Sequence, residues 1–240
     1  MTSIPAHFWT ALRDALAPAQ RRALLTSVVA AFLIFLALHA AVAWGIDEFR
    51  PERFPWLKWP LEILGSFAVL GLAWLLFPAV STTILSFYLD GVLDRLERQH
   101  YPALGPALPV PVSAVLRSGL RLLILTIALN LLALPIYLAI PAINLVLFYL
   151  LNGYLLSREY FDLVALRRLD GVAARTLWRE RRGRWLVAGM AIAALLSLPI
   201  ANLAAPLVAA ALMLHLVTEA AGLAAGGALA ERKTLQQGEG

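Results

Sequence analysis

A pair of adjacent arginines stands directly before the first long apolar stretch of the sequence. Arg21 and Arg22 are followed by 24 residues without a charge, from Ala23 to Ile46. Guanidinium groups bind tetrahedral oxyanions through charge-assisted hydrogen bonds, and the unpaired N–H groups at a helix N-terminus also attract anions. We therefore expect Arg21 and Arg22 to bind a dianion at the start of a helix. The alternative is that they only anchor this helix at a positively charged membrane face.

Two asparagines hold equivalent places after proline-rich breaks. Asn144 follows Pro135 and Pro141, and Asn202 follows Pro199. Each asparagine precedes an apolar stretch, so we expect each to act as the N-cap of a helix. If these breaks reach the bilayer interior, two helix N-termini point their positive dipole ends at its middle, where an anion can bind. The alternative is that each asparagine only stabilises its own turn.

An anion path through the membrane needs more polar groups than one chain offers in its apolar stretches. An unpaired charge in a low-dielectric interior costs roughly tens of kcal/mol, so a tunnel through uncharged half-helices is unfavourable. We therefore expect a homo-oligomer with its pore between subunits. The expected pore lining is hairpin backbone together with the polar side chains of Asn130, Tyr137, Asn144 and Asn152.

The sequence lacks the patterns that metal or covalent catalysis requires. It has no cysteine, and its four histidines, at positions 7, 39, 100 and 215, are not spaced as a ligand pair. It also has no Ser-His-Asp pattern, zinc motif or phosphate-binding glycine loop. We expect no enzyme activity, no metal site and no cofactor. Because no carboxylate falls in the middle of a predicted membrane segment, a channel-like anion path is favoured over a proton-driven pump.

Composition shows what kind of molecule must position these residues. The 240 residues are 61% hydrophobic and 15% charged, with a mean hydropathy of +0.77. A water-soluble domain has about 25% charged residues, so this excess of apolar surface needs a lipid environment. The sequence predicts an all-α polytopic membrane protein, with residues 1–240 as one domain. The arginine-rich segment 175–184 is flanked by apolar segments, so we expect it to contact anionic lipid headgroups and not nucleic acid.

The uncharged runs predict two spans and two hairpins. Residues 23–46 and 63–89 are each long enough to cross a bilayer, which takes about 20 residues. The runs 122–157 and 185–218 have 36 and 34 residues, too long for one crossing, and prolines interrupt both. Removing a turn leaves limbs of roughly 14 residues, about 21 Å each, which is short of a full crossing. We expect proline-broken, re-entrant hairpins at 117–158 and 181–219; two tightly turned full spans are the alternative.

The two expected hairpins also resemble each other at an offset of 64 residues. An Arg-x-Gly start and a Leu-Pro-Ile break recur in register in the segments 117–136 and 181–200. Leucine matches are common in apolar sequences, but this combination is not. We interpret the two segments as copies of one helical hairpin.

The basic residues predict the orientation. Only three of the 20 lie between the first two spans, so the positive-inside rule places the other 17, and both termini, in the cytoplasm. Apolar residues at helical spacing in the segments 4–16 and 92–96 predict amphipathic helices at the membrane interface. The tail 233–240 is expected to be disordered.

Several motifs of the chain resemble the CysZ-type sulfate permease family, which includes the eukaryotic etoposide-induced endoplasmic-reticulum proteins. The most specific is the run Asn-Gly-Tyr-Leu-Leu-Ser-Arg-Glu-Tyr-Phe at 152–161, supported by the segments 134–144 and 198–206. The resemblance covers about residues 5 to 230. The family typically opens its first span with Pro-Gly-(Leu/Ile)-Arg-Arg, which contributes a sulfate site. Residues 18–22 keep its arginine pair, with Ala19 in place of glycine.

The resemblance implies an oligomeric inner-membrane protein with two spans and two hemi-penetrating hairpins that passes sulfate toward cysteine synthesis. We therefore expect a sulfate or related oxyanion permease without its own ATPase, with Arg21, Arg22, Asn144 and Asn202 as substrate-binding residues. The alternative is a scaffolding or membrane-remodelling protein of the same fold that transports nothing, because half-penetrating hairpins and interfacial helices also suit that role.

Overall fold

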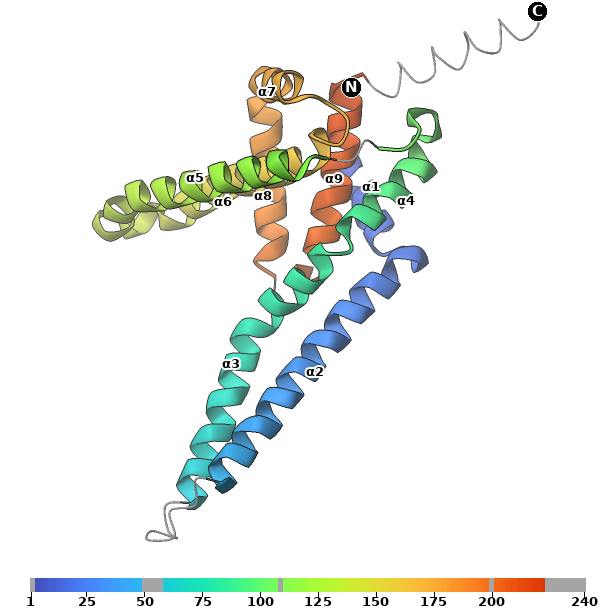
Figure 1. Cartoon of the computed structure of the whole chain (residues 1–240). Helices are drawn as coiled ribbons and strands as arrows, with labels where there is room; N and C mark the ends of the chain where they lie inside the picture. Colours follow the sequence, from blue (N-terminus) through green and yellow to red (C-terminus); the bar gives the residue numbers. More distant parts are fainter. Residues whose placement is uncertain (1–2, 49–57, 108–109, 199–200, 223–240) are drawn as a thin grey trace, which may run out of the picture.

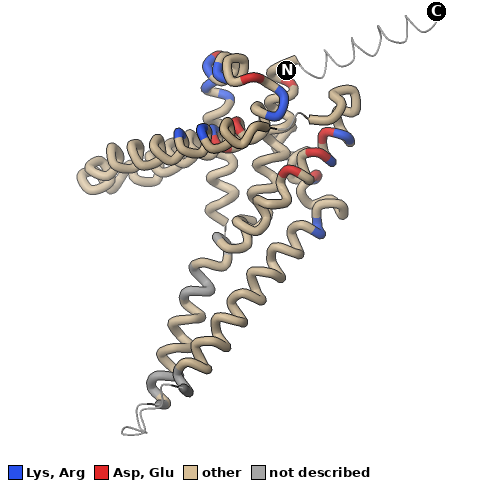
Figure 2. The backbone as a smooth tube through the Cα atoms, viewed as in Figure 1, with Lys and Arg blue, Asp and Glu red and all other residues tan. Residues whose placement is uncertain are grey.

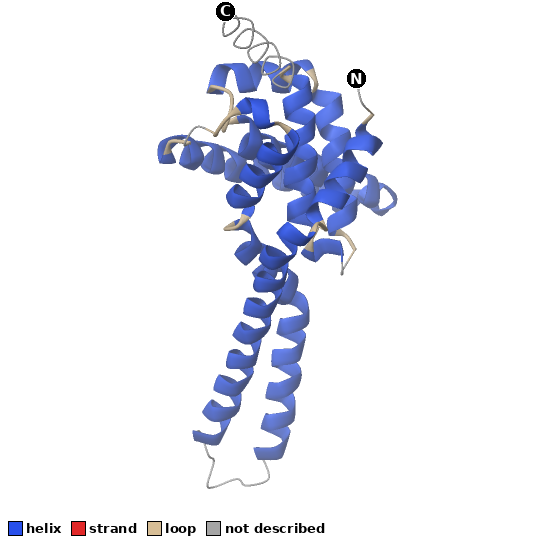
Figure 3. Cartoon of the chain, turned by 90° about the vertical axis from the view of Figure 1, so that its right-hand side faces the viewer, coloured by secondary structure: helices blue, strands red, loops and turns tan. Residues whose placement is uncertain are grey.

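The computed structural model describes residues 3–48, 58–107, 110–198 and 201–222, and every regular element in these ranges is a helix. The predicted all-α class is confirmed for this part of the chain. Two long helices, α2 (Pro18–Glu48) and α3 (Lys58–Ser86), pack along each other and extend away from a body formed by the other helices (Figures 1 and 3). The expected tail at 233–240 lies outside the described residues.

The first predicted span is confirmed as a helix of sufficient length. Residues 23–46 lie within α2, whose segment Pro18–Gly45 is long and apolar enough to cross a membrane. The second predicted span, 63–89, is three residues too long. α3 ends at Ser86, because the N–H groups of Phe87 and Tyr88 donate to carbonyls three residues back and tighten the last turn. Leu89 already belongs to the next helix, α4 (Leu89–His100).

The first hairpin breaks in the second half of the predicted segment 135–144. It consists of α5 (Val112–Ala139), the short 3-10 turn η3 (Pro141–Ile143) and α6 (Asn144–Ala165). Of the predicted break residues, Pro135 does not interrupt the helix, because α5 runs through this proline, whereas Pro141 and Asn144 do lie at the break. The helix ends before Pro141, where Ile140 takes an extended φ of −134°, as the residue before a proline prefers.

The limb lengths of the two hairpins differ. α5 has 28 residues, about 42 Å, and like α2 it is long and apolar enough to span a membrane. The expectation of a limb near 14 residues is wrong here. The second hairpin agrees with it: α8 (Arg182–Leu196) has 15 residues and α9 (Ala205–Ala220) has 16, with η4 (Ala201–Leu203) before α9. The predicted break at Pro199 lies outside the described residues.

The core of the body is built around α9. Every residue from Ala205 to Thr218 is buried, and α1 (Ile4–Ala15), α4, α6 and α8 pack around this helix. A helix that is apolar all round needs a partner on every side. Here the partners are other helices of the same chain, so the alanines of α9 serve packing within one molecule.

The apolar faces of the two expected interfacial helices point into this core. In α4, Val92, Leu93 and Leu96 are fully buried, which leaves that face no surface for lipid. In α1, Ala11 and Ala15 are buried against the same core, while Trp9 stays 55% exposed. The periodicity therefore correctly indicated helices with one apolar face. In α4, this face packs against other helices of the chain.

The two hairpins cross at a pair of glycines. A Cβ on Gly189 of α8 would overlap the backbone carbonyl of Gly153 in α6, and a Cβ on Gly153 would lie 2.7 Å from the Met190 side chain. The helices approach this closely only because neither position carries a side chain. The first hairpin consequently projects sideways from the body, across α8 (Figure 1).

Candidate functional site

The arginine pair lies exposed in the first turn of α2. The Nε of Arg21 donates to the carbonyl of Leu16 at 3.1 Å. The N–H groups of Gln20 and Arg21 both donate to the carbonyl of Ala17, at 3.0 and 3.2 Å. These two first-turn N–H groups are therefore already paired within the chain, and the charge available to an anion comes mainly from the guanidinium groups.

A third arginine, which the sequence analysis missed, reaches the same helix end. Arg95 of α4 donates from Nη1 to the carbonyl of Ala19 at 3.0 Å, while its Nε donates to Gly91 at 3.0 Å. Ala19 precedes Arg21 by two residues, so α4 delivers a further positive charge to the start of α2 (Figure 2). No local pattern indicates this contact, because Arg95 and Ala19 are 76 residues apart.

Neither asparagine caps its helix, so the N-cap prediction is wrong for both. Asn144 is the first helical residue of α6, and its side-chain amide donates back to the carbonyl of Tyr137 at 3.1 Å. That carbonyl lies four residues before Pro141, which has no N–H to offer it. In the second hairpin the N-cap of α9 is Ala204, and Asn202 lies in η4.

The predicted pore residues lie along the projecting hairpin. Asn130 and Asn152 donate to carbonyls one turn earlier in their own helices, those of Thr126 and Phe148, at 2.8 and 2.9 Å. Tyr137 is half-buried and meets Asn144 through the bond described above. Among the predicted residues, a hydrogen bond thus joins Asn144 to Tyr137 in the described structure. Asn202 and the arginine pair lie on other parts of the molecule.

A different set of residues lines a cavity of about 860 Å³ in the described structure. It lies where α3, α4, α5 and α6 come together, and none of the seven predicted residues reaches it. Its charged lining consists of four carboxylates and one guanidinium group: Asp90, Asp94, Glu159, Asp162 and Arg167. Such an excess of negative charge disfavours a dianion, so this cavity is a poor sulfate site.

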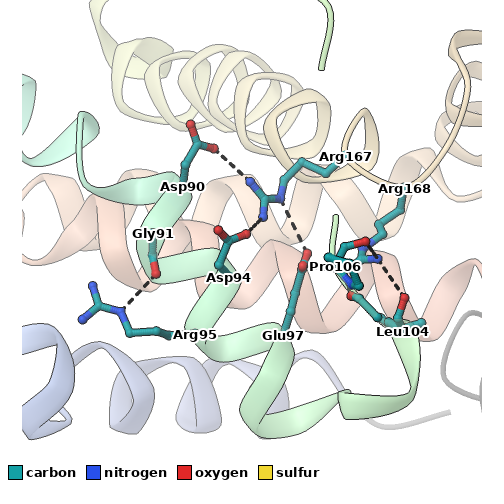
Figure 4. A network of polar contacts seen from close by, with 10 residues as sticks. Asp90, Gly91, Asp94, Arg95, Glu97, Leu104, Pro106, Arg167 and Arg168 are labelled. Atoms are coloured by element: carbon teal, nitrogen blue, oxygen red, sulfur yellow. Dashed lines mark hydrogen bonds and ion pairs between the residues drawn. The ribbon is translucent and has the colours of Figure 1, made fainter. Parts of the chain in front are cut away.

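The arginines at the end of the first hairpin are held in an ion network (Figure 4). Arg167 contacts Asp90 at 3.0 Å, Asp94, and Glu97 at 3.6 Å. Arg168 contacts Glu97 at 2.5 Å and donates to the carbonyls of Leu104, Gly105 and Pro106. Both guanidinium groups are used to fasten α4 to the segment after α6, so the network is a structural clamp.

The model of the family described as sulfate transporter CysZ/etoposide-induced protein 2.4 matches residues 7–206. The chain belongs to this family. Among curated proteins, no sequence matches it. Membership in the sulfate transporter CysZ/etoposide-induced protein 2.4 family agrees with the apolar helices and makes this a membrane protein of the sulfate-transporter type.

The body also contains a buried polar cluster. Two of its members, His215 and Glu219, come after the matched segment 7–206. At the junction of α1, α4 and α9, Asp14 accepts hydrogen bonds from His215 at 2.9 Å and His100 at 3.0 Å. Tyr101 contacts the other ring nitrogen of His215 at 2.9 Å. Glu219 binds His7 at 2.6 Å and Arg184 at 2.7 Å nearby.

The environment of the cluster shifts the pKa values of Asp14 and Tyr101 in opposite directions. Burial opposes ionisation of Asp14, but the hydrogen bonds from His215 and His100 outweigh it and leave the pKa of Asp14 below its usual value. Burial, with the charges of Glu219 and Asp14, raises the pKa of Tyr101 to about 12. At neutral pH the site therefore holds an ionised carboxylate and a neutral phenol. Sequence spacing could not indicate it, because Asp14 and His215 are 201 residues apart.

Proposed function

We propose that this protein is a permease for sulfate or a related oxyanion in the bacterial inner membrane, with channel-like uptake that feeds sulfur assimilation. The observation that carries this proposal is that Arg21 and Arg22 lie exposed near the start of α2 and that Arg95 binds the Ala19 carbonyl there, in a chain of the CysZ/etoposide-induced family. Three guanidinium groups at one helix end suit a tetrahedral dianion, since each offers several charge-assisted hydrogen bonds.

The path itself is proposed to lie between subunits of a homo-oligomer. Leu116, Leu131, Leu132 and Leu138 of α5 are each at least 67% exposed, which gives the first hairpin an apolar surface for lipid or another copy. Asn144 and Asn202 lie in different hairpins and do not meet within one chain. A site that uses both is completed across an interface, with Asn130, Tyr137 and Asn152 along the pore.

The proposed topology has α2 and α3 as spans and both termini in the cytoplasm, with the hairpins entering from that side and the outer surfaces in contact with membrane lipids. Two observations support it. The helices of the second hairpin, about 22 to 24 Å long, are shorter than the hydrocarbon core of about 30 Å. The start of α1 lies beside α9, away from the far ends of α2 and α3 (Figure 1).

Uptake of labelled sulfate into liposomes containing the purified protein tests the proposal. The wild type is expected to exceed empty vesicles, and the double variant Arg21→Ala/Arg22→Ala to lower the initial rate by about tenfold or more. Each lost charge-assisted hydrogen bond is worth about 1.5 to 3 kcal/mol, and tenfold corresponds to about 1.4 kcal/mol. The matched control is Arg175→Ala/Arg179→Ala, which removes the same charge from exposed positions of α7 (Gly171–Glu180).

Two other outcomes contradict parts of the proposal. Uptake that both double variants leave equally intact rejects the arginine site while retaining transport. Uptake no greater than that of empty vesicles rejects transport and favours the second candidate, a membrane scaffold. The exposed leucine surface of α5 is the observation that favours such a role, because an apolar hairpin inserted in one leaflet deforms a bilayer.

A further inference from the structure

Three of the four histidines of the chain gather at one place, although they lie far apart in the sequence. His100 ends α4, His215 lies in α9 and His7 lies in α1, where the ring of His7 stacks on that of His215 with centroids 6.0 Å apart. The rings of His100 and His215 meet edge to face at 5.0 Å. The carboxylate of Asp14, which is in α1, lies between His100 and His215.

The ligand atoms of this cluster already have nearly the spacing that a metal ion imposes. The Nε2 atom of His215 lies 2.9 Å from one oxygen of Asp14, and that of His100 lies 3.0 Å from the other. All three ligand atoms lie within 4.8 Å of one another. Zinc bonds of about 2.0 to 2.2 Å in a tetrahedron place ligands roughly 3.3 Å apart, so small side-chain adjustments suffice.

We propose that Asp14, His100 and His215 form a binding site for a divalent transition-metal ion of the zinc type, which fastens α1 to α4 and α9. Two imidazoles and one carboxylate are a ligand set that zinc uses, with water in the fourth position. The proposal does not depend on sulfate transport. One of the proposed ligands, His215, lies beyond residue 206, where the match to the family model ends.

The surroundings of the ligands suit this role. Tyr101 contacts Nδ1 of His215, which fixes the ring and leaves Nε2 directed at Asp14. Such a second contact on a ligating histidine is a regular feature of metal sites.

Access and charge are also favourable. The side chains of Asp14 and His215 are only 8% and 3% exposed, whereas that of His100 is 27% exposed, so water and an ion can enter on the His100 side. The neighbouring carboxylate, Glu219, is paired with His7 and Arg184, so it does not compete directly for the ion. The site would thus replace hydrogen bonds to one buried carboxylate by metal bonds.

Metal binding to the purified full-length chain, prepared without a histidine tag and stripped with a chelator, tests the proposal. We expect one Zn²⁺ per chain by calorimetry and elemental analysis, and Co²⁺ to give the visible absorption of a tetrahedral site. Saturating Zn²⁺ is expected to raise the Tm in detergent, because an ion that binds only the folded state stabilises it. His100→Ala should weaken Zn²⁺ affinity at least about a hundredfold, and Tyr101→Phe about tenfold.

The control variant is His39→Ala, which removes the one histidine outside the cluster, from an exposed position of α2. It should bind Zn²⁺ as the wild type does. Because His215 is buried and its loss can impair folding, Asp14→Asn is the second ligand variant, since it keeps the shape of the side chain and removes one carboxylate oxygen. Absence of stoichiometric Zn²⁺ binding by the folded wild type overturns the proposal, as does unchanged affinity in both His100→Ala and Asp14→Asn.

Discussion

At the scale of single residues, the sequence predicted the position of the charged arginine pair better than the hydrogen bonds that the asparagine side chains make. The exposed arginine pair at the start of α2 lies where the sequence predicts it. The two asparagines do not cap, because capping depends on where a helix begins, and α6 and α9 each begin at a position that the prolines alone do not specify. Contacts such as Asp14 with His215 depend on the whole fold and leave no local pattern.

A cap that does form is Asp170, whose carboxylate accepts from the N–H groups of Val172 and Ala173, both at 2.8 Å, at the start of α7. These bonds lower the pKa of Asp170 below its ordinary value of 3.8. The cap therefore stabilises fully above pH 3.8 and is lost as pH falls through the lower folded value. Asp170→Ala is expected to lower the Tm in detergent at pH 7, and Asp170→Asn to lower it much less, because asparagine also caps. Equal losses in both variants would indicate that charge, not capping, is responsible.

At the scale of elements, the uncharged runs located the long apolar segments but predicted neither the length of α5 nor where each helix ends. The break of the first hairpin was expected across Pro135, Pro141 and Asn144, yet α5 continues past Pro135 and the break falls at Pro141. One proline removes only one hydrogen bond, and a long helix tolerates that loss when its other bonds are intact. The same Leu-Pro-Ile motif recurs in the sequence after the end of α8, where Pro199 and Ile200 lie outside the described residues.

The close crossing of the two hairpins depends on Gly153 and Gly189. Gly189→Ala places a methyl group against the Gly153 backbone, which cannot move aside as a flexible side chain could. We expect a loss of about 2 kcal/mol or more in the free energy of unfolding. Denaturant unfolding in detergent measures it. The matched control, Gly183→Ala in the same helix, meets nothing within 4 Å and should be neutral or slightly stabilising. If the two variants are equally stable, the close crossing is incorrect.

At the scale of the whole molecule, the chain divides its apolar surface between two uses. α9 is buried from Ala205 to Thr218 by the chain itself, whereas α2 and α5 leave leucines exposed along most of their length. Composition alone gives the total apolar content and cannot show which apolar side chains are buried and which are exposed. The ion network of Arg167 and Arg168 and the polar cluster at Asp14 both hold α4 in place. The arginine-bearing end of α2 is therefore positioned by contacts from several distant segments.

The membrane arrangement follows from comparing helix lengths. α8 and α9 are too short to cross, but α5, at about 42 Å, can do so, and this makes the end of α5 the decisive position. Because the native chain has no cysteine, single cysteines can be labelled with a membrane-impermeant maleimide in spheroplasts. With re-entrant hairpins, Ala139→Cys and Leu203→Cys stay unlabelled from outside, while Glu52→Cys, between the two proposed spans, is labelled.

Labelling of Ala139→Cys alone from outside would make α5 a full crossing that tilts through the bilayer, since its length exceeds the hydrocarbon core by about 12 Å. The second hairpin would then remain the only re-entrant element. Ala173→Cys, at an exposed position of α7, is the cytoplasmic control and must react only after the membrane is opened. Labelling of both hairpin turns from outside would reject the re-entrant arrangement, and the anion site would then depend on the arginines at the start of α2 alone.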